Sequence, residues 1–89
     1  MRIDYTVQIW KEGSQFVGHA MPIDVVSSGN TPDQACPALD EAVRLFLTTA
    51  QEAGTLHEVL GECCYEFREG AWQAPKWVSV ERHSALLSA

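Results

Sequence analysis

The sequence predicts an α+β domain in two layers, in the order β-β-β-α-(short α)-β, in which one main helix covers an antiparallel-rich sheet. Apolar and polar residues alternate with a period of two near the start of the chain, which is typical of strands with one buried face. An apolar stripe with helical spacing follows in the middle of the chain. With 89 residues, 46% of them hydrophobic, the chain has material for one small core.

The first three strands are predicted at residues 3–10, 15–21 and 23–28. One face of the first strand carries Ile3, Tyr5, Val7 and Ile9, and the opposite face carries Asp4, Thr6, Gln8 and Trp10. Gly13 suits a tight turn between the first two strands. Pro22 separates the second strand from the third, because proline cannot donate to a sheet ladder. We expect the first of the two faces to meet the helix and the second to stay uncovered.

A long helix is predicted from Thr31, its cap, to Gly54, its stop. Proline, aspartate and glutamine follow the cap in the order that helix starts favour. The apolar stripe consists of Ala35, Leu39, Ala42, Val43, Phe46, Ala50 and Ala53. Pro37 breaks the pattern, because its ring meets a carbonyl of the preceding turn and one helical hydrogen bond is lost. Either the helix kinks at Pro37 or the regular helix begins near Cys36.

A second capping box at residues 55–58 predicts a short helix through Leu60 that ends at Gly61. Alternation over residues 63–68 then predicts a fourth strand, which would place Cys63 and Cys64 on opposite sheet faces.

Beyond a turn at residues 69–70 we expect an irregular connection over residues 72–77 and a short last strand at Val78 and Val80. We therefore divide the chain into a β-β-β-α-β domain, residues 1–70, and a C-terminal extension, residues 71–89. The extension holds the short strand and a tail and is not a separate domain.

The charge balance is acidic, with a net charge of −6. Such a chain repels nucleic acid, because duplex binding is largely phosphate neutralisation, and it suits a basic protein partner. We expect no direct nucleic-acid binding and no membrane span, since no apolar run approaches ~18 residues. The N-terminus does not resemble a signal-peptide core, and three cysteines form neither a disulfide framework nor a zinc pattern. A reduced, cytoplasmic protein is expected.

Candidate chemical groups favour a binding protein over an enzyme. The carboxylates Asp4, Asp24, Asp40 and Glu41 do not form the converging set that a two-metal nuclease requires. No histidine has a cysteine or carboxylate at ligand spacing on a defined element, and no base is evident beside a cysteine. We expect no catalytic residues, no metal and no cofactor.

The three tryptophans are the strongest candidates for an interface, although core packing explains them as well. The expected partner-binding residues are Gln8, Trp10, His19, Trp72 and Trp77. Val78 and Val80 are the expected contacts between subunits of a homo-oligomer, a dimer or higher, because their strand has no hairpin partner nearby in the sequence.

Three features resemble the HicB family, the antitoxin half of HicA–HicB toxin–antitoxin pairs. They are an opening hairpin over residues 5–20, a strand-to-helix junction over residues 27–35, and an amphipathic helix over residues 39–47. The junction is similar to the family's G-x-T-x-x-E-A pattern, with Gln34 in the place of glutamate. The resemblance spans roughly residues 3–60.

The resemblance implies a partial RNase-H-like fold and neutralisation of a small basic HicA-type, mRNA-cleaving toxin by occlusion. Two features depart from the family. The turn before the third strand is reduced to residues 21–25, and residues 69–89 are too short for the DNA-binding domain that many members carry. The alternatives are a stand-alone, self-associating RNase-H-like remnant without a toxin partner and, last, a minimal metal-dependent nuclease.

Overall fold

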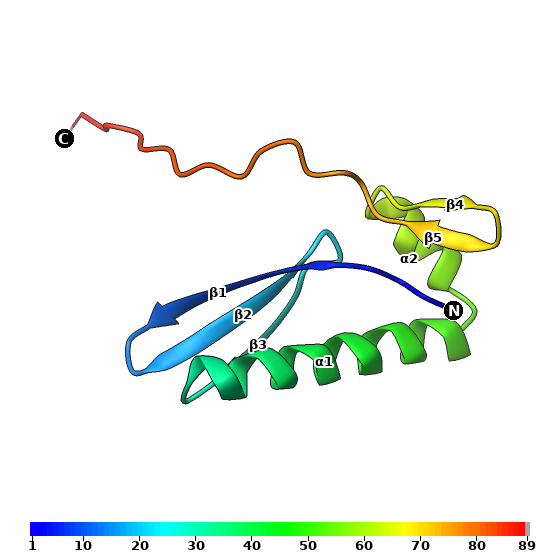
Figure 1. Cartoon of the computed structure of the whole chain (residues 1–89), viewed down its shortest axis with the longest axis horizontal. Coiled ribbons are helices and arrows are strands. Elements are labelled where there is room, and N and C mark those ends of the chain that lie inside the picture. The colour runs from blue at the N-terminus through cyan, green and yellow to red at the C-terminus, as the bar shows by residue number, and fades with distance from the viewer. Residues whose placement is uncertain (89) are drawn as a thin grey trace.

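A computed structural model describes residues 1–88 and has the expected α+β class. Its elements are β1 (Thr6–Glu12), β2 (Gln15–Met21), β3 (Val25–Gly29), α1 (Pro32–Glu52), α2 (Leu56–Glu62), β4 (Glu66–Arg68) and β5 (Ala71–Gln73). The first three strands form one antiparallel sheet in the order β1-β2-β3, and β4 and β5 form a separate two-stranded sheet. In Figure 1, α1 lies along one side of the larger sheet.

The start of α1 agrees with its sequence signals. The backbone N–H of Gln34 donates to the Thr31 side chain at 3.1 Å, and the Gln34 side chain accepts from the Asn30 N–H at 3.1 Å. The helix runs from Pro32 through Pro37, so of the two alternatives for Pro37 the regular start near Cys36 is wrong.

The apolar stripe of α1 is only partly buried. Ala35, Leu39, Val43 and Ala50 are buried, whereas Phe46 is 39% exposed. Leu47 packs against the core instead, one position further along the helix. The predicted burial of Phe46 is therefore wrong, because this turn of the helix directs the neighbouring side chain to the core.

One core connects the larger sheet, both helices and the small hairpin. Its buried members are Ala20, Ile23, Leu39, Val43, Ala50, Leu56, Leu60, Tyr65 and Trp72. Trp72 lies in the segment that sequence analysis assigned to the C-terminal extension, yet it is 7% exposed. The chain therefore contributes core residues up to β5.

The predicted strand over residues 63–68 is mostly wrong. Helix α2 continues to Glu62, Cys63 follows as its C-cap, and Cys64 turns the chain with a φ of 68°. Only the last three residues form β4, so the two cysteines do not lie on opposite faces of a strand. The two-residue turn into β5 has positive φ at both residues, 51° at Glu69 and 76° at Gly70, which suits a tight hairpin.

The second capping box is also absent. The Thr55 side chain caps no N–H of α2, and its hydroxyl donates instead to the carbonyl of Ala50 at 3.3 Å. Because α1 and α2 are so close in sequence, this threonine closes the end of the first helix rather than opening the second. Helix α2 also runs past the predicted stop at Gly61.

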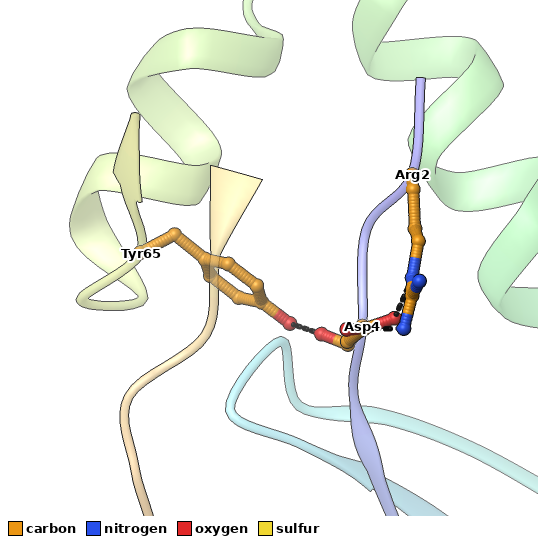
Figure 2. Close-up of polar contacts among 3 residues, drawn as sticks. All are labelled: Arg2, Asp4 and Tyr65. Carbon is orange, nitrogen blue, oxygen red and sulfur yellow. Dashed lines mark hydrogen bonds and ion pairs between the residues drawn. The ribbon is translucent and has the colours of Figure 1, made fainter. Parts of the chain in front are cut away.

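The N-terminal segment, residues 1–5, joins the small hairpin to the larger sheet. Ile3 forms a parallel bridge with Trp72, and β1 begins only at Thr6. Figure 2 shows the Tyr65 hydroxyl donating to the backbone carbonyl of Asp4, whose side chain pairs with Arg2 at 3.0 Å. The N-terminal segment therefore lies between the larger sheet, into which it leads, and the region of Tyr65 and Trp72, which is remote in sequence.

Residues 74–88 form neither helix nor strand and extend away from the hairpin (Figure 1). We call this segment the C-terminal arm. The predicted short strand at Val78 and Val80 is not formed, and these side chains are 98% and 64% exposed. Within residues 1–88 no strand pairs with them, so their side chains contact mainly solvent.

Helices that combine the length and the hydropathy needed to cross a membrane are not found among residues 1–88.

Both tyrosines of the chain should titrate at unusually high pH. Burial, with a hydrogen bond to Asp40 at 2.6 Å, raises the pKa of Tyr5 to about 12, and burial raises the pKa of Tyr65 to about 12. Because the folded state favours the neutral phenols, their contribution to stability is complete below pH ~10 and is lost as the pH rises through 12. We expect tyrosinate absorbance at 295 nm to appear near pH 12 in native protein and near pH 10 in urea. Native titration near pH 10 would contradict the burial.

Candidate protein-binding face

The larger sheet has one face that α1 covers and one that it leaves open. The covered face includes Val7 and Ala20, which pack in the core, and Gly18, where an added Cβ would lie 3.2 Å from Leu39. Side chains alternate between faces along a strand, and the register fixes which ones lie together. The open face, called the outer face here, carries Thr6, Gln8, Trp10, Glu12, Gln15, Val17, His19, Met21, Val26 and Ser28.

An exposed apolar patch lies in the middle of the outer face. Trp10 is 42% exposed and lies opposite Val17 on the neighbouring strand. Its ring packs edge-on against His19, with a distance of 6.4 Å between ring centroids. Val26 lies opposite His19 on the other side and is 56% exposed. A tryptophan bordered by aliphatic and imidazole groups is suited to exclude water from a protein interface.

The polar groups of the outer face are one carboxylate, one imidazole and uncharged side chains. The His19 Nε2 lies 2.6 Å from the carboxylate of Asp24, a residue of the turn between β2 and β3. Glu12 lies at the end of β1, and none of the ten outer-face residues is lysine or arginine. A basic surface could therefore approach the strands of this face without meeting a lysine or arginine side chain from them.

The structure brings together some of the predicted partner-binding residues. Gln8 lies directly opposite His19, beside Trp10, on the outer face. Trp77 reaches the same face from the C-terminal arm, where its indole N–H donates to the Thr6 hydroxyl at 2.6 Å. Sequence reasoning correctly grouped Gln8 and Trp10 on the uncovered face.

Trp72 lies elsewhere. Its ring packs edge-on against His57, with 5.0 Å between centroids, and lies 5.1 Å from the ring of Phe67. Its side chain is a core group, and its indole N–H is buried without a hydrogen-bond partner within residues 1–88. The structure therefore does not place Trp72 on the outer face.

Sequence reasoning did not single out the aliphatic members of the outer face, which are Val17, Met21 and Val26. Alternation within the second strand was the available signal, because it separates residues 17, 19 and 21 from the buried Gly18 and Ala20.

The carboxylates weighed as candidates for metal chemistry are held by different partners. Asp4 pairs with Arg2, Asp24 with His19, and Asp40 accepts from the Tyr5 hydroxyl. Glu41 pairs with Arg44 at 2.6 Å, which holds the pKa of that carboxyl below its usual range. In the described part of the chain, no three histidine, cysteine, aspartate or glutamate side chains gather closely enough to hold a metal ion.

The cysteines are free thiols within the described residues. Burial raises the pKa of the Cys63 thiol, which disfavours the reactive thiolate. Cys64 is exposed in the turn after α2, and Cys36 is half-buried on α1.

A cavity of about 340 Å³ lies between the N-terminal segment and α1. Val43 and Ile3 contribute apolar surface, while Asp40 and Arg44 contribute polar groups. These two polar groups are already paired with Tyr5 and Glu41. Both of these polar groups are therefore engaged within the chain.

Comparison with protein-family models, curated protein sequences and solved structures found no match. The fold and the outer face define a small α+β protein with one uncovered sheet face.

Proposed function

We propose that this chain is a HicB-like antitoxin, or a binding protein derived from one, that neutralises a small basic HicA-type mRNA-cleaving toxin by occlusion. The observation that carries the proposal is the outer face, where exposed Trp10 lies among aliphatic groups without a lysine or arginine. Such a face provides an apolar anchor for a protein and no repulsion toward a basic one.

The order of elements supports the partial RNase-H-like part of the proposal. The resemblance implies a βββα unit followed by a further strand, and the chain has three antiparallel strands followed by α1. The parallel bridge between Ile3 and Trp72 brings the segment after α2 back beside the start of β1. The small hairpin therefore lies beside the segment that leads into β1.

In the proposed mechanism, the acidic chain attracts the basic toxin and Trp10 then anchors the contact. Residues 1–73 carry a net charge of −7, because Lys76, Glu81 and Arg82 are the only ordinarily charged residues that follow. Long-range attraction of this kind raises the association rate at low salt and is screened as salt increases. Burial of the indole ring against the toxin then slows dissociation. The toxin is blocked because its RNA-binding surface is covered, with no chemical step by this chain.

The second candidate is a self-associating RNase-H-like remnant without a toxin, and the exposed C-terminal arm is the observation that favours it. The adjacent reading frame discriminates between the two, because a basic protein of similar or smaller size encoded there favours the antitoxin. A minimal nuclease ranks last, since the carboxylates are held apart by separate partners.

The test is a binding titration with the purified product of the adjacent reading frame. We expect Trp10→Ala to raise the Kd by about 30-fold, the effect of losing a strong interface anchor. The matched control is Leu45→Ala on the outward side of α1, where the side chain is 54% exposed, and we expect an unchanged Kd. Trp10→Phe should recover part of the affinity, and circular dichroism should verify that each variant is folded.

The association rate should also fall at least tenfold between 0.05 M and 0.5 M salt, because charge steering is screened. Equal affinities for wild type and Trp10→Ala would show that the partner does not use the outer face. Absence of binding at tens of micromolar would contradict the proposed function itself.

A further inference from the structure

We infer that the C-terminal arm is exchanged between two copies of this chain, so that residues 78–82 of each copy add a strand to the free β1 edge of the other. The inference concerns self-assembly and is independent of the proposed function. Within residues 1–88, four observations support it. The arm is extended, it does not pair with its own sheet, one edge of β1 is unpaired, and the arm and the rest of the chain differ in charge.

The arm has the side-chain pattern of a strand that lacks a sheet. Ser79 and His83 both contact Glu81, which accepts from the Ser79 hydroxyl at 2.6 Å and lies 3.1 Å from the His83 ring nitrogen. Val78 and Val80 occupy the alternate positions and are 98% and 64% exposed. This separation of polar and apolar groups with a period of two is typical of a strand with one face to bury.

The arm is held off the edge of its own sheet. It leaves β5 beside the N-terminal segment, but Pro75 lacks the N–H that a continuing ladder would need. Trp77 then hydrogen-bonds the Thr6 side chain, which belongs to the outer face, so the arm passes over that face rather than along the β1 edge. Figure 1 shows the arm continuing away from the body as a separate extended segment. Its valines therefore require another copy for burial.

The free edge of β1 is the complementary feature. β1 pairs with β2 on one side only, and no backbone hydrogen bond from residues 13–88 reaches its other side between Val7 and Glu12. An unpaired edge is a template for a strand of another chain. The fifteen residues of the arm reach about 50 Å when extended, which is more than twice the length of β1.

The charge of the arm suits a strand edge on an acidic body. The arm carries Lys76 and Arg82 against a single carboxylate, Glu81, whereas residues 1–73 carry a net charge of −7. The arm is therefore attracted to an acidic body, whether its own or that of another copy, and the course of the arm away from its own β1 edge is what favours the second copy. Reciprocal exchange satisfies both arms and both edges, as expected for a closed twofold dimer. Pairing at the edge adds no contact to Trp10, Val17 or Val26 of the outer face, so dimerisation and binding of a basic partner there are compatible.

Sedimentation equilibrium of the full chain between 5 and 100 µM tests the assembly. We expect the wild type to be a dimer at 100 µM. The double variant Val78→Lys/Val80→Lys should have a dimer dissociation constant at least tenfold higher. The matched control is Leu86→Lys/Leu87→Lys, which adds the same charge at side chains that are 100% and 91% exposed and lie outside the pairing segment. This control should stay dimeric. A wild-type monomer at 100 µM, an unaffected valine variant, or an equally weakened control would overturn the inference.

Exchange between copies is tested by a spin label at Val80→Cys in a background without Cys36, Cys63 and Cys64. The same experiment is repeated with the label at Ser84→Cys, outside residues 78–82, so that the label does not replace a pairing side chain. Labelled, unenriched chains are mixed with unlabelled, 15N-enriched chains, so that paramagnetic broadening reports only contacts between copies. We expect the amide signals of β1 to be broadened in the mixture. Broadening that occurs only when the label and the 15N enrichment are on one chain would show that the arm folds on its own sheet, and would overturn the inference.

Discussion

Leu39→Ala is expected to lower the free energy of unfolding by about 2–5 kcal/mol, which is the usual loss for a buried leucine. Leu39 is fully buried between α1 and the larger sheet, where its side chain lies in the space above Gly18. A cavity at this point removes contacts from both layers at once. Because domains of this kind have only about 5–15 kcal/mol of stability, the variant should be partly unfolded at 37 °C.

Urea unfolding followed by tryptophan fluorescence measures this loss. Leu45→Ala on the same helix is the control, because its side chain is 54% exposed, and its effect should stay within about 0.5 kcal/mol. Equal losses for the two variants would contradict the assignment of which helix face is buried.

Gly29→Ala should be the second severe change. An added Cβ would lie 2.7 Å from the backbone nitrogen of Ala35 and 2.9 Å from the backbone carbon of Gln34. These atoms belong to the first turn of α1 and cannot rotate away, so the helix start must move from β3. We expect a loss of about 1–3 kcal/mol, the usual range for overpacking, with a lower Tm.

Gly61→Ala is the matched control, because an added Cβ there has no other atom within 4 Å and the residue lies inside α2. Alanine is the better helix former, so this change should be neutral or stabilise by up to about 1 kcal/mol. Thermal unfolding of the two variants side by side measures the difference. A neutral Gly29→Ala would show that β3 and α1 do not approach as closely as described.

The elements with strong local signals could be predicted from the sequence. Period-two alternation marked β1, and Thr31 with its following proline marked the start of α1. The observed limits of the first three strands nevertheless differ from the predicted limits by up to three residues. Ile3, for example, lies outside β1 because its partner is Trp72 of β5, a contact that no local pattern reveals.

The region after α1 was predicted less well, because its local signals compete with burial. Cys63 and Cys64 alternate like strand residues, yet α2 continues to Glu62 because Leu60 and Tyr65 must both reach the core. Burial of side chains from distant segments overrode the local pattern in this case. The two-residue turn at Glu69 and Gly70 was a usable signal for the hairpin of β4 and β5.

Some residues of the candidate site could also be predicted from local pattern, and others could not. Gln8 and Trp10 follow from alternation within one strand, and His19 joins them through the register of the first hairpin. Trp72 and Trp77 are five residues apart and have similar sequence surroundings, but one is buried in the core and the other contacts Thr6. That difference depends on the hairpin and the N-terminal segment, which are contacts of tertiary structure.

The most direct test of partner binding uses the side-chain N–H signals of the three tryptophans. Each indole gives one 15N-resolved resonance, which single Trp→Phe variants assign. On titration with the purified basic product of the adjacent reading frame, we expect the Trp10 resonance to shift and saturate at one partner per outer face. The resonance of Trp72, which is buried in the core, should stay unchanged. A Trp10 signal that does not move at a saturating partner concentration would contradict binding through the outer face.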